Sequence, residues 1–480
     1  MKKNIVLLLC FLCVIPVLPA FKWVINFPSS GGTIQSIAAG PDGTIYATGG
    51  FNGTMTVGDV TYTAKSTRMN DHDFFLFAFA PDRSVKWIKT GGGKGPDCGS
   101  YVAQGGDSVF VAGQFSGTME LDGGGSVSSA GKGSMFIARY SLEGERTWIK
   151  TTVNDGYITL DGFIADTGGN LYAMGGFDGE YIKFGTVSLK KKKGLNWFIV
   201  KYTGAGEVMN VIHVNGGDIM FITKVQGRAI AVNKEGAIYF TGSIIEEADF
   251  GGLTHKTTVT KHHDGPDFND EEMFLVKYSP GGKPLWYKKI GSGGEPIDMK
   301  FDSAGNIVIA GYIDGVGYPG PSNYPKTFAD VGGKRFTLAR KDDSLIPKDI
   351  FIAKFDPSGN CLWAVSYGDI GGDEPRSLAI DKDDSIIIGG FFSDRMSIGK
   401  TSIAGWSPGK NDALVAKFDK NGKPLWAFGG GGKKWDHVNS VAVSPNGTVY
   451  AGGYFEDTVM FGKTELKSRS YNSFFLSAVK

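Results

Sequence analysis

The sequence predicts an all-β fold, a seven-bladed β-propeller of four-stranded antiparallel blades. Three observations support it: a recurring tryptophan strand, recurring hairpins, and an offset between the two ends of the chain. Glycine supplies 72 of the 480 residues and aromatic side chains supply 12%, which fits many short strands joined by tight turns. No stretch shows the 3.6-residue apolar period of a long helix, which argues against folds that alternate strands and helices.

A short apolar strand with a tryptophan marks each repeat of roughly sixty residues. The tryptophans at this position are Trp23, Trp87, Trp148, Trp286, Trp363 and Trp426, and Asn210 fills the place in the third repeat. Upstream, apolar residues alternate up to a glycine-containing turn, as in residues 349–360, which is a hairpin signal. A second hairpin follows, in which residues 36–51 match residues 440–454. Each repeat therefore supplies four strands.

The ends of the chain indicate a ring rather than an open solenoid. The last repeat, from about residue 433 to 480, lacks a tryptophan strand, and residues 21–27 supply one before the first full repeat. Four twisted strands cannot bury both faces alone, and radial closure leaves no long exposed edge. We therefore expect the N-terminal strand to complete the last blade, so that residues 21–480 form a single domain.

The first twenty residues have the features of a secretory signal peptide. Lys2 and Lys3 precede an apolar run from Ile5 to Leu18, and Ala20 follows. The run is shorter than the roughly 20 residues that span a bilayer. We expect residues 1–20 to be removed and the mature chain to be secreted, periplasmic or at the cell surface, with no stable membrane insertion after signal cleavage.

Charge and motifs narrow the classes of function. Lys plus Arg (50) nearly equals Asp plus Glu (49), so no basic field would attract nucleic acid. The chain has no Gly-x-Ser-x-Gly or His-Glu-x-x-His motif, and its glycine runs precede no helix that would cradle a phosphate. The mature chain keeps only Cys98 and Cys361, which we expect in distant blades and therefore unbridged. We expect a protein or glycan partner and no nucleic acid.

Residues 349–363, the segment Gly371-Gly372-Asp373-Glu374 and residues 377–381 together resemble the bacterial SBBP (seven-bladed β-propeller) repeat family. The shared pattern is a Phe-x-Ala-Lys-type strand, an Asp-x-x-Gly turn, a tryptophan strand, a Gly-Gly-acidic linker and an apolar-Asp strand. It covers nearly the whole mature chain, except that Asn210 replaces a tryptophan and the linker is weak around residues 214–224. The resemblance implies a secreted or surface propeller and no shared activity.

Residues 419–426 are also similar to the tryptophan-docking segment of quinoprotein-type propellers, which include dehydrogenases and outer-membrane assembly scaffolds. The quinoprotein enzymes carry a calcium-and-quinone centre, and no such centre is found in this sequence. We interpret the similarity as a shared way of docking a tryptophan between neighbouring blades.

The longest insertions, residues 63–71, 255–272 and 315–348, are expected between second and third strands. They would share one face, opposite the short Asp-x-x-Gly turns, and loops on a rigid scaffold concentrate binding residues. We predict that this face is the docking surface, the alternative being solvated loops without a partner.

One insertion carries residue types that bind metals. The candidate ligands are His262, His263, Asp264, Asp267, Asp270 and Glu271. Calcium prefers closely spaced carboxylates, whereas zinc would use the imidazoles. The alternative is a solvated acidic loop, and we expect no cofactor unless calcium binds.

A second candidate site combines carboxylates from several repeats. Asp97, Asp373 and Asp436 share one register just before the innermost strand, and Glu295 and Glu374 lie one position further on. In a ring they would approach the mouth of the central channel, where like charges can hold a cation or raise a pKa. Alternatively, they hydrogen-bond the loop backbones.

These features favour a secreted binding or scaffold module that contacts a protein or glycan through its long-loop face. The alternative is an extracellular propeller enzyme, a hydrolase, lyase or quinoprotein-like oxidoreductase, with an acidic and calcium-holding channel mouth. An enzyme would need carboxylates and a histidine within hydrogen-bond reach. A binding module should instead expose an aromatic or apolar patch among the loops, and we favour this reading over an enzyme.

Overall fold

The structure is a computed structural model that describes residues 21–66, 68, 71–216, 226–260, 268–269, 271–314, 328–338, 348–369 and 371–479. No residue within these ranges belongs to a helix, so the all-β prediction is confirmed. It follows that no helix in the described part of the chain could cross a membrane. The predicted signal peptide, residues 1–20, lies outside the described residues.

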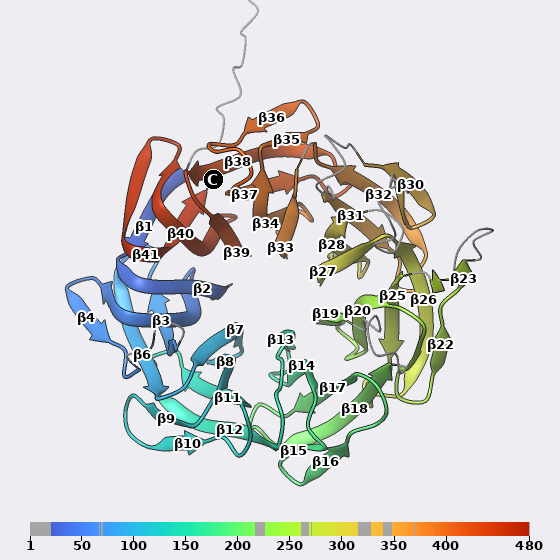
Figure 1. Ribbon diagram of the computed structural model, residues 1–480, viewed down its shortest axis with the longest axis horizontal. Coiled ribbons are helices and arrows are strands. Elements are labelled where there is room, and N and C mark those ends of the chain that lie inside the picture. The colour runs from blue at the N-terminus through green and yellow to red at the C-terminus, as the bar shows by residue number, and fades with distance from the viewer. Residues whose placement is uncertain are drawn as a thin grey trace, which may run out of the picture.

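The strands form four-stranded antiparallel sheets around a central opening (Figure 1). We number these sheets, in the described part of the chain, as units 1 to 7. Unit 1 contains β2 (Ser29–Ala39), β3 (Ile45–Val57), β5 (Asp73–Phe79) and β6 (Val85–Gly93); unit 2 contains β7 (Asp97–Gly105), β8 (Ser108–Phe115), β11 (Ser134–Ser141) and β12 (Arg146–Asn154). Unit 3 contains β13 (Gly162–Ala165), β14 (Leu171–Phe177), β17 (Asn196–Tyr202) and β18 (Val208–Gly216); unit 4 contains β19 (Gln226–Val232), β20 (Ile238–Ile244), β25 (Glu272–Tyr278) and β26 (Pro284–Ser292).

Units 5 to 7 continue the same order. Unit 5 contains β27 (Gly294–Phe301), β28 (Ile307–Ile313), β31 (Asp349–Phe355) and β32 (Cys361–Tyr367); unit 6 contains β33 (Glu374–Ile380), β34 (Ile386–Ser393), β37 (Asn411–Phe418) and β38 (Pro424–Gly432). Unit 7 contains β39 (Asp436–Val443), β40 (Val449–Phe461), β41 (Thr464–Val479) and β1 (Phe21–Phe27). The arrangement of the sheets is propeller-like.

The two ends of the chain meet in unit 7. Strand β1 pairs antiparallel with β41, with Phe27 opposite Phe474. The buried ring of Phe27 stacks on Phe474 at 5.1 Å between centroids and lies 5.2 Å from the ring of Phe77 in unit 1. Strand β1 therefore supplies the fourth strand of unit 7 and packs against unit 1.

Two of the recurring tryptophans, and the asparagine that replaces one, bind the next unit by hydrogen bonds. The indole Nε1 of Trp87 donates to the carbonyl of Leu142 at 2.8 Å, in the turn between the third and fourth strands of unit 2. Trp148 makes the same bond to Gly204 of unit 3, at 3.2 Å. Asn210 keeps the bond through its side-chain amide, which donates to Gly281 at 3.0 Å. The shared function of this position is to bind the neighbouring turn, which explains why asparagine can replace tryptophan.

Hairpins between second and third strands extend the sheet of the preceding unit. In unit 2, β9 (Thr118–Leu121) and β10 (Ser126–Ser128) form such a hairpin, and β9 pairs with the end of β6. The same extension is made by β15 (Tyr181–Phe184) with β16 (Val187–Lys190), by β21 (Glu247–Asp249) with β22 (Thr254–Lys256), by β29 (Phe328–Val331) with β30 (Lys334–Thr337), and by the outer parts of β40 and β41. Further pairs are formed by β4 (Val60–Thr63) on β3, by β23 (Val259–Thr260) with β24 (Phe268–Asn269), and by β35 (Arg395–Ile398) with β36 (Thr401–Ala404). The extended ends of the fourth strands are therefore not open edges.

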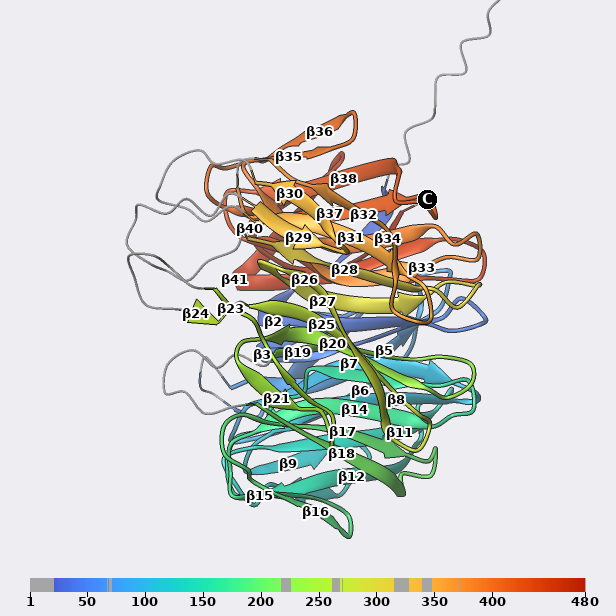
Figure 2. The ribbon, with the colours of Figure 1, turned by 90° about the vertical axis from the view of Figure 1, so that its right-hand side faces the viewer.

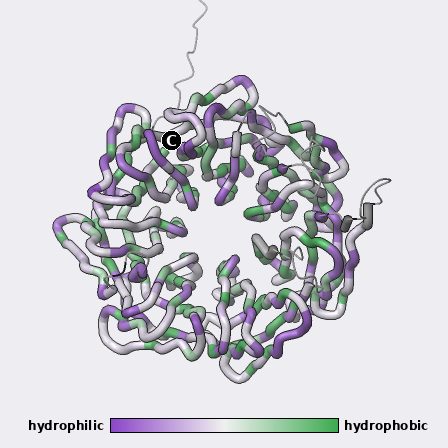
Figure 3. Tube along the Cα trace, in the orientation of Figure 1, coloured by the Kyte–Doolittle hydropathy of each residue, from purple (hydrophilic) through white to green (hydrophobic). Residues whose placement is uncertain are grey.

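The apolar core lies between neighbouring sheets. Phe74 of unit 1, for example, packs edge-on against Phe136 of unit 2 at 5.3 Å, and both are fully buried. Figure 3 shows hydrophobic stretches along the strands of all the sheets. Cys98 and Cys361 are free, as expected for residues of distant units. Each sheet therefore depends on its neighbours for burial of its two faces.

Replacing Phe27 by alanine tests the packing of β1. We expect Phe27→Ala to lower the free energy of unfolding by about 3–5 kcal/mol, because it leaves a cavity against Phe77 and Phe474. The control is Lys22→Ala on the same strand, whose side chain is exposed and whose loss should change stability by less than about 0.5 kcal/mol. Urea unfolding measures both, and equal stabilities of the two variants would contradict the packing of β1.

Candidate functional site

The sheets have two distinct faces because their strands are antiparallel. The turns from first to second and from third to fourth strands lie on one side, which we call the turn face. The loops from second to third strands and the links between units lie on the other, which we call the loop face. In the edge-on view of Figure 2, β23 and β24 mark the loop face and the C-terminal end of β41 marks the turn face.

The predicted metal loop is only partly described. His262, His263, Asp264, Asp267 and Asp270 lie outside the described residues, and Glu271 directly precedes β25. The next residue, Glu272, is buried, and its carboxylate lies 3.0 Å from His255 Nε2 and 3.1 Å from Lys289 Nζ. Burial opposes ionisation of Glu272, but the hydrogen bonds from His255, Thr258 and Lys289 outweigh it and lower its pKa. Among the described residues, no group of three or more His, Cys, Asp or Glu is arranged to hold a metal ion.

The predicted channel-mouth residues lie at the loop-face ends of innermost strands. Asp97 begins β7, Asp436 begins β39, and Asp373 directly precedes β33. All three are fully buried, and Glu295 is 2% exposed. Glu374 is partly exposed, and Lys348 Nζ lies 2.7 Å from its carboxylate. The three aspartates are therefore enclosed between units and do not face open solvent.

Each of these aspartates has a buried carboxyl neighbour that sequence reasoning missed. The pairs are Asp73 with Asp97, Asp349 with Asp373, and Asp412 with Asp436. The neighbours that were missed, Asp73, Asp349 and Asp412, lie at the starts of third strands, where each looks like an ordinary polar residue. The fixed spacing within each pair, repeated three times, is the sequence signal that could have revealed them.

Glycines at the ends of the fourth strands make room for the pairs. A side chain at Gly92 would collide with the carboxyl of Asp73, and one at Gly431 would collide with Asp412. The sequence shows only that no helix follows these glycine runs. In the structure, the absence of a Cβ lets a carboxyl lie directly on the backbone.

Burial and like charge keep a proton on these pairs. Burial, followed by the charge of Asp73, raises the pKa of Asp97 to about 8. Burial also raises the pKa of Asp436 to about 9, with a smaller contribution from Asp412. Burial beside Asp349 raises the pKa of Asp373 well above its usual value. Two adjacent buried carboxyls cannot both ionise near neutral pH, so we expect each pair to hold at least one proton.

Other units have neutral or charge-compensated groups at the corresponding third-strand position. The residue there is Ser134 in unit 2, Asn196 in unit 3 and Ser473 in unit 7. Asn196 is hydrogen-bonded by His213 at 2.9 Å, whereas Glu272 in unit 4 has Lys289 and His255 as partners. A proton on an aspartate pair acts in the same direction, because it removes one of the two buried negative charges.

The loop face at the junction between units 6 and 7 exposes large aromatic side chains. Trp406, Trp435 and Tyr471 are 45%, 38% and 70% exposed. The backbone N–H of Trp406 donates to Asp412 at 2.8 Å, and the carbonyl of Trp435 accepts from the N–H of Glu456 at 3.2 Å. The two tryptophans are therefore fixed to the backbone beside the acid pair. The sequence predicts an aromatic patch among the longest loops, whereas the structure places this one on shorter loops.

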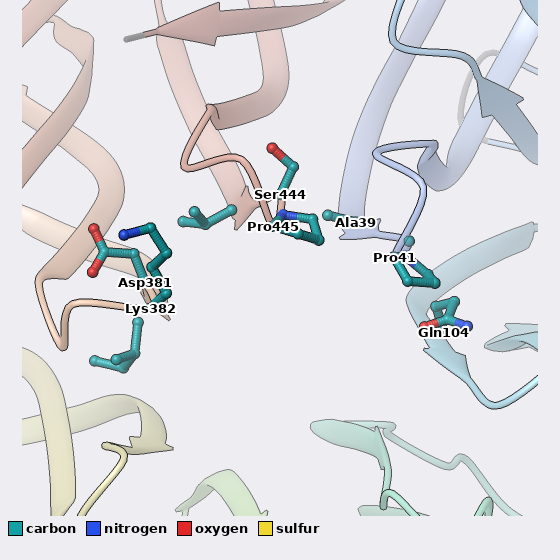
Figure 4. Close-up of a pocket in the computed structure, with 10 residues that line it drawn as sticks. Ala39, Pro41, Gln104, Asp381, Lys382, Ser444 and Pro445 are labelled. Carbon is teal, nitrogen blue, oxygen red and sulfur yellow. The ribbon is translucent and has the colours of Figure 1, made fainter.

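A shallow hollow of about 300 Å³ lies on the turn face, across the central opening (Figure 4). Its lining includes Pro41, Gln104, Asp381, Lys382, Ser444 and Pro445, which come from units 1, 2, 6 and 7. The carboxylate of Asp381 accepts backbone N–H bonds within its own turn and lies 2.7 Å from Lys417 Nζ. This carboxylate therefore stabilises its own turn.

Comparison with known proteins yields remote similarities. No protein-family model matches the sequence. The chain is 25% identical over 369 residues to an uncharacterised WD repeat-containing protein of Acanthamoeba polyphaga mimivirus, a match covering 67% of this chain and 26% of the viral protein. The chain therefore corresponds to about a quarter of that relative. The repeat character of the viral protein agrees with the propeller-like arrangement of the sheets.

Two solved structures are also similar to this chain. Sqt1 from Chaetomium thermophilum is 10% identical, with 94% of this chain and 86% of that chain covered and a TM-score of 0.41. A putative 6-phosphogluconolactonase from Bacteroides fragilis is 11% identical, with 89% and 97% covered and a TM-score of 0.38.

The acid pairs predict how stability depends on pH. Their aspartates bind protons in the folded state up to about pH 8–9, whereas unfolded aspartates lose them near pH 4. The free energy of unfolding should therefore be highest in mild acid and fall by a few kcal/mol as pH rises from about 4 to 9. The double variant Asp97→Asn/Asp436→Asn should flatten this decline in urea unfolding at pH 5, 7 and 9.

The control Asp107→Asn changes an exposed carboxylate and should keep the wild-type slope. The alternative is that calcium neutralises the pairs. If protons neutralise them instead, the melting temperature should be the same in calcium and in a chelator. Stability that rises towards pH 9, or a melting temperature raised by calcium, would contradict the shared proton.

Proposed function

We propose that the protein is a secreted, closed seven-bladed β-propeller that acts as a binding or scaffold module for an extracellular protein or glycan. The pairing of β1 with β41 and the tryptophan bonds between units support closure. The WD repeat-containing relative is consistent with a propeller of this kind. Export rests on the signal-like features of residues 1–20.

The observation that carries the proposed function is the set of exposed aromatic side chains on the loop face. Trp406 and Trp435 are held by backbone hydrogen bonds at a buried junction, so their rings are presented on a rigid support. Exposed apolar groups gathered in one place mark interaction sites, and aromatic residues contribute strongly to binding energy. The loop face is therefore the proposed docking surface.

The enzyme alternative has one observation in its favour, the raised pKa values of Asp97 and Asp436, since perturbed carboxyls occur at catalytic sites. Both side chains are fully buried, so a substrate could not reach them without opening the junction. A quinoprotein-like or calcium-dependent enzyme that used these carboxyls would also need the junction to open before its substrate reached them. We therefore favour the binding module.

Substitutions on opposite faces test the proposal. The mature chain, residues 21–480, is immobilised and assayed by biolayer interferometry against a panel of extracellular glycans and purified extracellular proteins. A partner that binds should lose at least about tenfold in affinity with Trp406→Ala/Trp435→Ala. The matched control Pro41→Ala/Lys382→Ala, on the turn face, should keep full affinity. Binding that is lost only in the turn-face variant would overturn the assignment of the loop face.

A further inference from the structure

Two junctions of the loop face present the same combination of a lysine and an aromatic ring. Between units 6 and 7, Lys410 Nζ lies 5.4 Å from the ring centroid of Trp435. Between units 2 and 3, Lys132 Nζ lies 4.7 Å from the ring centroid of Tyr157. Tyr157 is 57% exposed and Trp435 is 38% exposed.

The two aromatic residues occupy one structural position. The carbonyl of Tyr157 accepts from the N–H of Asp178, and that of Trp435 accepts from the N–H of Glu456, each at 3.2 Å. Each aromatic residue directly precedes a residue paired with the end of the second strand of its unit. The lysines also correspond, because each lies two residues before the buried polar residue at the start of the third strand.

The fold does not require an aromatic residue at this position. The same backbone bond is made by Pro96 between units 1 and 2, at 3.1 Å, and by Gly293 between units 4 and 5, at 2.9 Å. Proline and glycine therefore suffice for the junction. The stability of the junction therefore does not explain why Tyr157 and Trp435 carry exposed rings at this position.

Further lysines surround both rings. Lys191 Nζ donates to the carbonyl of Asp178 at 3.1 Å, and this places Lys191 close to Tyr157, whereas Lys192 pairs with Asp249 at 3.2 Å. Lys433 and Lys434 directly precede Trp435. The acidic groups near Tyr157 are engaged by backbone amides, since Tyr157 N–H donates to Asp178 at 2.6 Å and Tyr181 N–H donates to Asp155 at 3.3 Å. Each ring therefore has lysines beside it, and carboxylates of the fold lie among them: Asp155 and Asp178 near Tyr157, and Glu456 near Lys410 and Lys434.

We propose that these two sites, Lys132 with Tyr157 and Lys410 with Trp435, bind the sugar rings of a carboxylate-bearing glycan. The inference rests on the proposed binding function and names its ligand class. An exposed aromatic face accepts the C–H face of a pyranose ring, and the adjacent ammonium groups pair with the sugar carboxylate. This combination of groups selects an acidic sugar over a neutral one.

The backbone at these junctions disfavours a peptide that would bind by adding a strand. An extended peptide binds by adding a strand to a free sheet edge. Here the carbonyl groups of both aromatic residues are already bonded within the fold, and the fourth strands β12 and β38 are extended by β15 and β40. Side-chain recognition of a sugar needs no free edge.

The two sites lie on opposite sides of the central opening, as the positions of β12 and β38 in Figure 1 show. Both belong to the loop face, so one long polymer could contact both. A second contact made by a tethered chain raises the overall affinity strongly. We therefore expect a long polymer to bind more tightly than a short oligomer.

Titration of the mature chain with oligogalacturonate and with long-chain polygalacturonate, followed by calorimetry, tests the proposal. The polymer should bind at least about tenfold more tightly than the oligomer, and neutral galactan should not bind. Tyr157→Ala and Trp435→Ala should each abolish the advantage of the polymer, and the double variant should lose binding. Lys132→Arg/Lys410→Arg should retain binding, whereas Lys132→Gln/Lys410→Gln should lose it.

The matched control is Leu425→Ala, which removes an exposed apolar side chain from the fourth strand of unit 6 and should leave binding unchanged. Melting temperatures of all variants show that they remain folded. Equally tight binding of polyglutamate or of duplex DNA would overturn the proposal, as would unchanged polygalacturonate binding in the Tyr157→Ala/Trp435→Ala variant. If another partner binds through the loop face while polygalacturonate does not, the glycan inference fails and the proposed binding function stands.

Discussion

Pairing of the first strand with the last is the contact on which the rest of this structure depends. Each four-stranded sheet has two apolar faces, so it needs a neighbour on both sides, and β1 supplies the missing strand of unit 7 while it packs against unit 1. At three other junctions, a fourth-strand tryptophan or asparagine donates a hydrogen bond to the turn of the next unit. The free energy of folding is therefore shared among units that are not stable alone.

The junctions combine structural and functional demands within a few residues. Glycines at the ends of fourth strands let carboxyl groups such as Asp73 and Asp412 lie on the backbone. Their partners Asp97 and Asp436 begin the next innermost strands, and Trp435 of the loop face directly precedes Asp436 in the chain. A rigid junction of this kind presents an exposed ring with little loss of conformational entropy on binding. In this account, the core of the junction stabilises the fold and its outer end contacts the ligand.

The repeat could be predicted from sequence because its signals are local. Alternating apolar residues, glycine turns and the tryptophan position all lie within a few residues of each other, and even Asn210 was placed correctly by spacing. The acid pairs leave only a repeated spacing in the sequence, because Asp73 and Asp97 become neighbours through the packing of unit 1 against unit 2. Their burial is likewise a tertiary property, since an aspartate at a strand start is usually solvated. The equivalence of Tyr157 and Trp435 depends on backbone bonds to Asp178 and Glu456, which no sequence pattern marks.

Hydrogen exchange of the two terminal segments, followed by mass spectrometry, tests the central claim most directly. If β1 closes the ring, backbone amides of residues 21–27 and 472–479 exchange only with global unfolding, as slowly as those of the central strands β34 and β37. Rapid exchange of residues 21–27, with the rest of the chain protected, would contradict closure and leave unit 7 with an open edge.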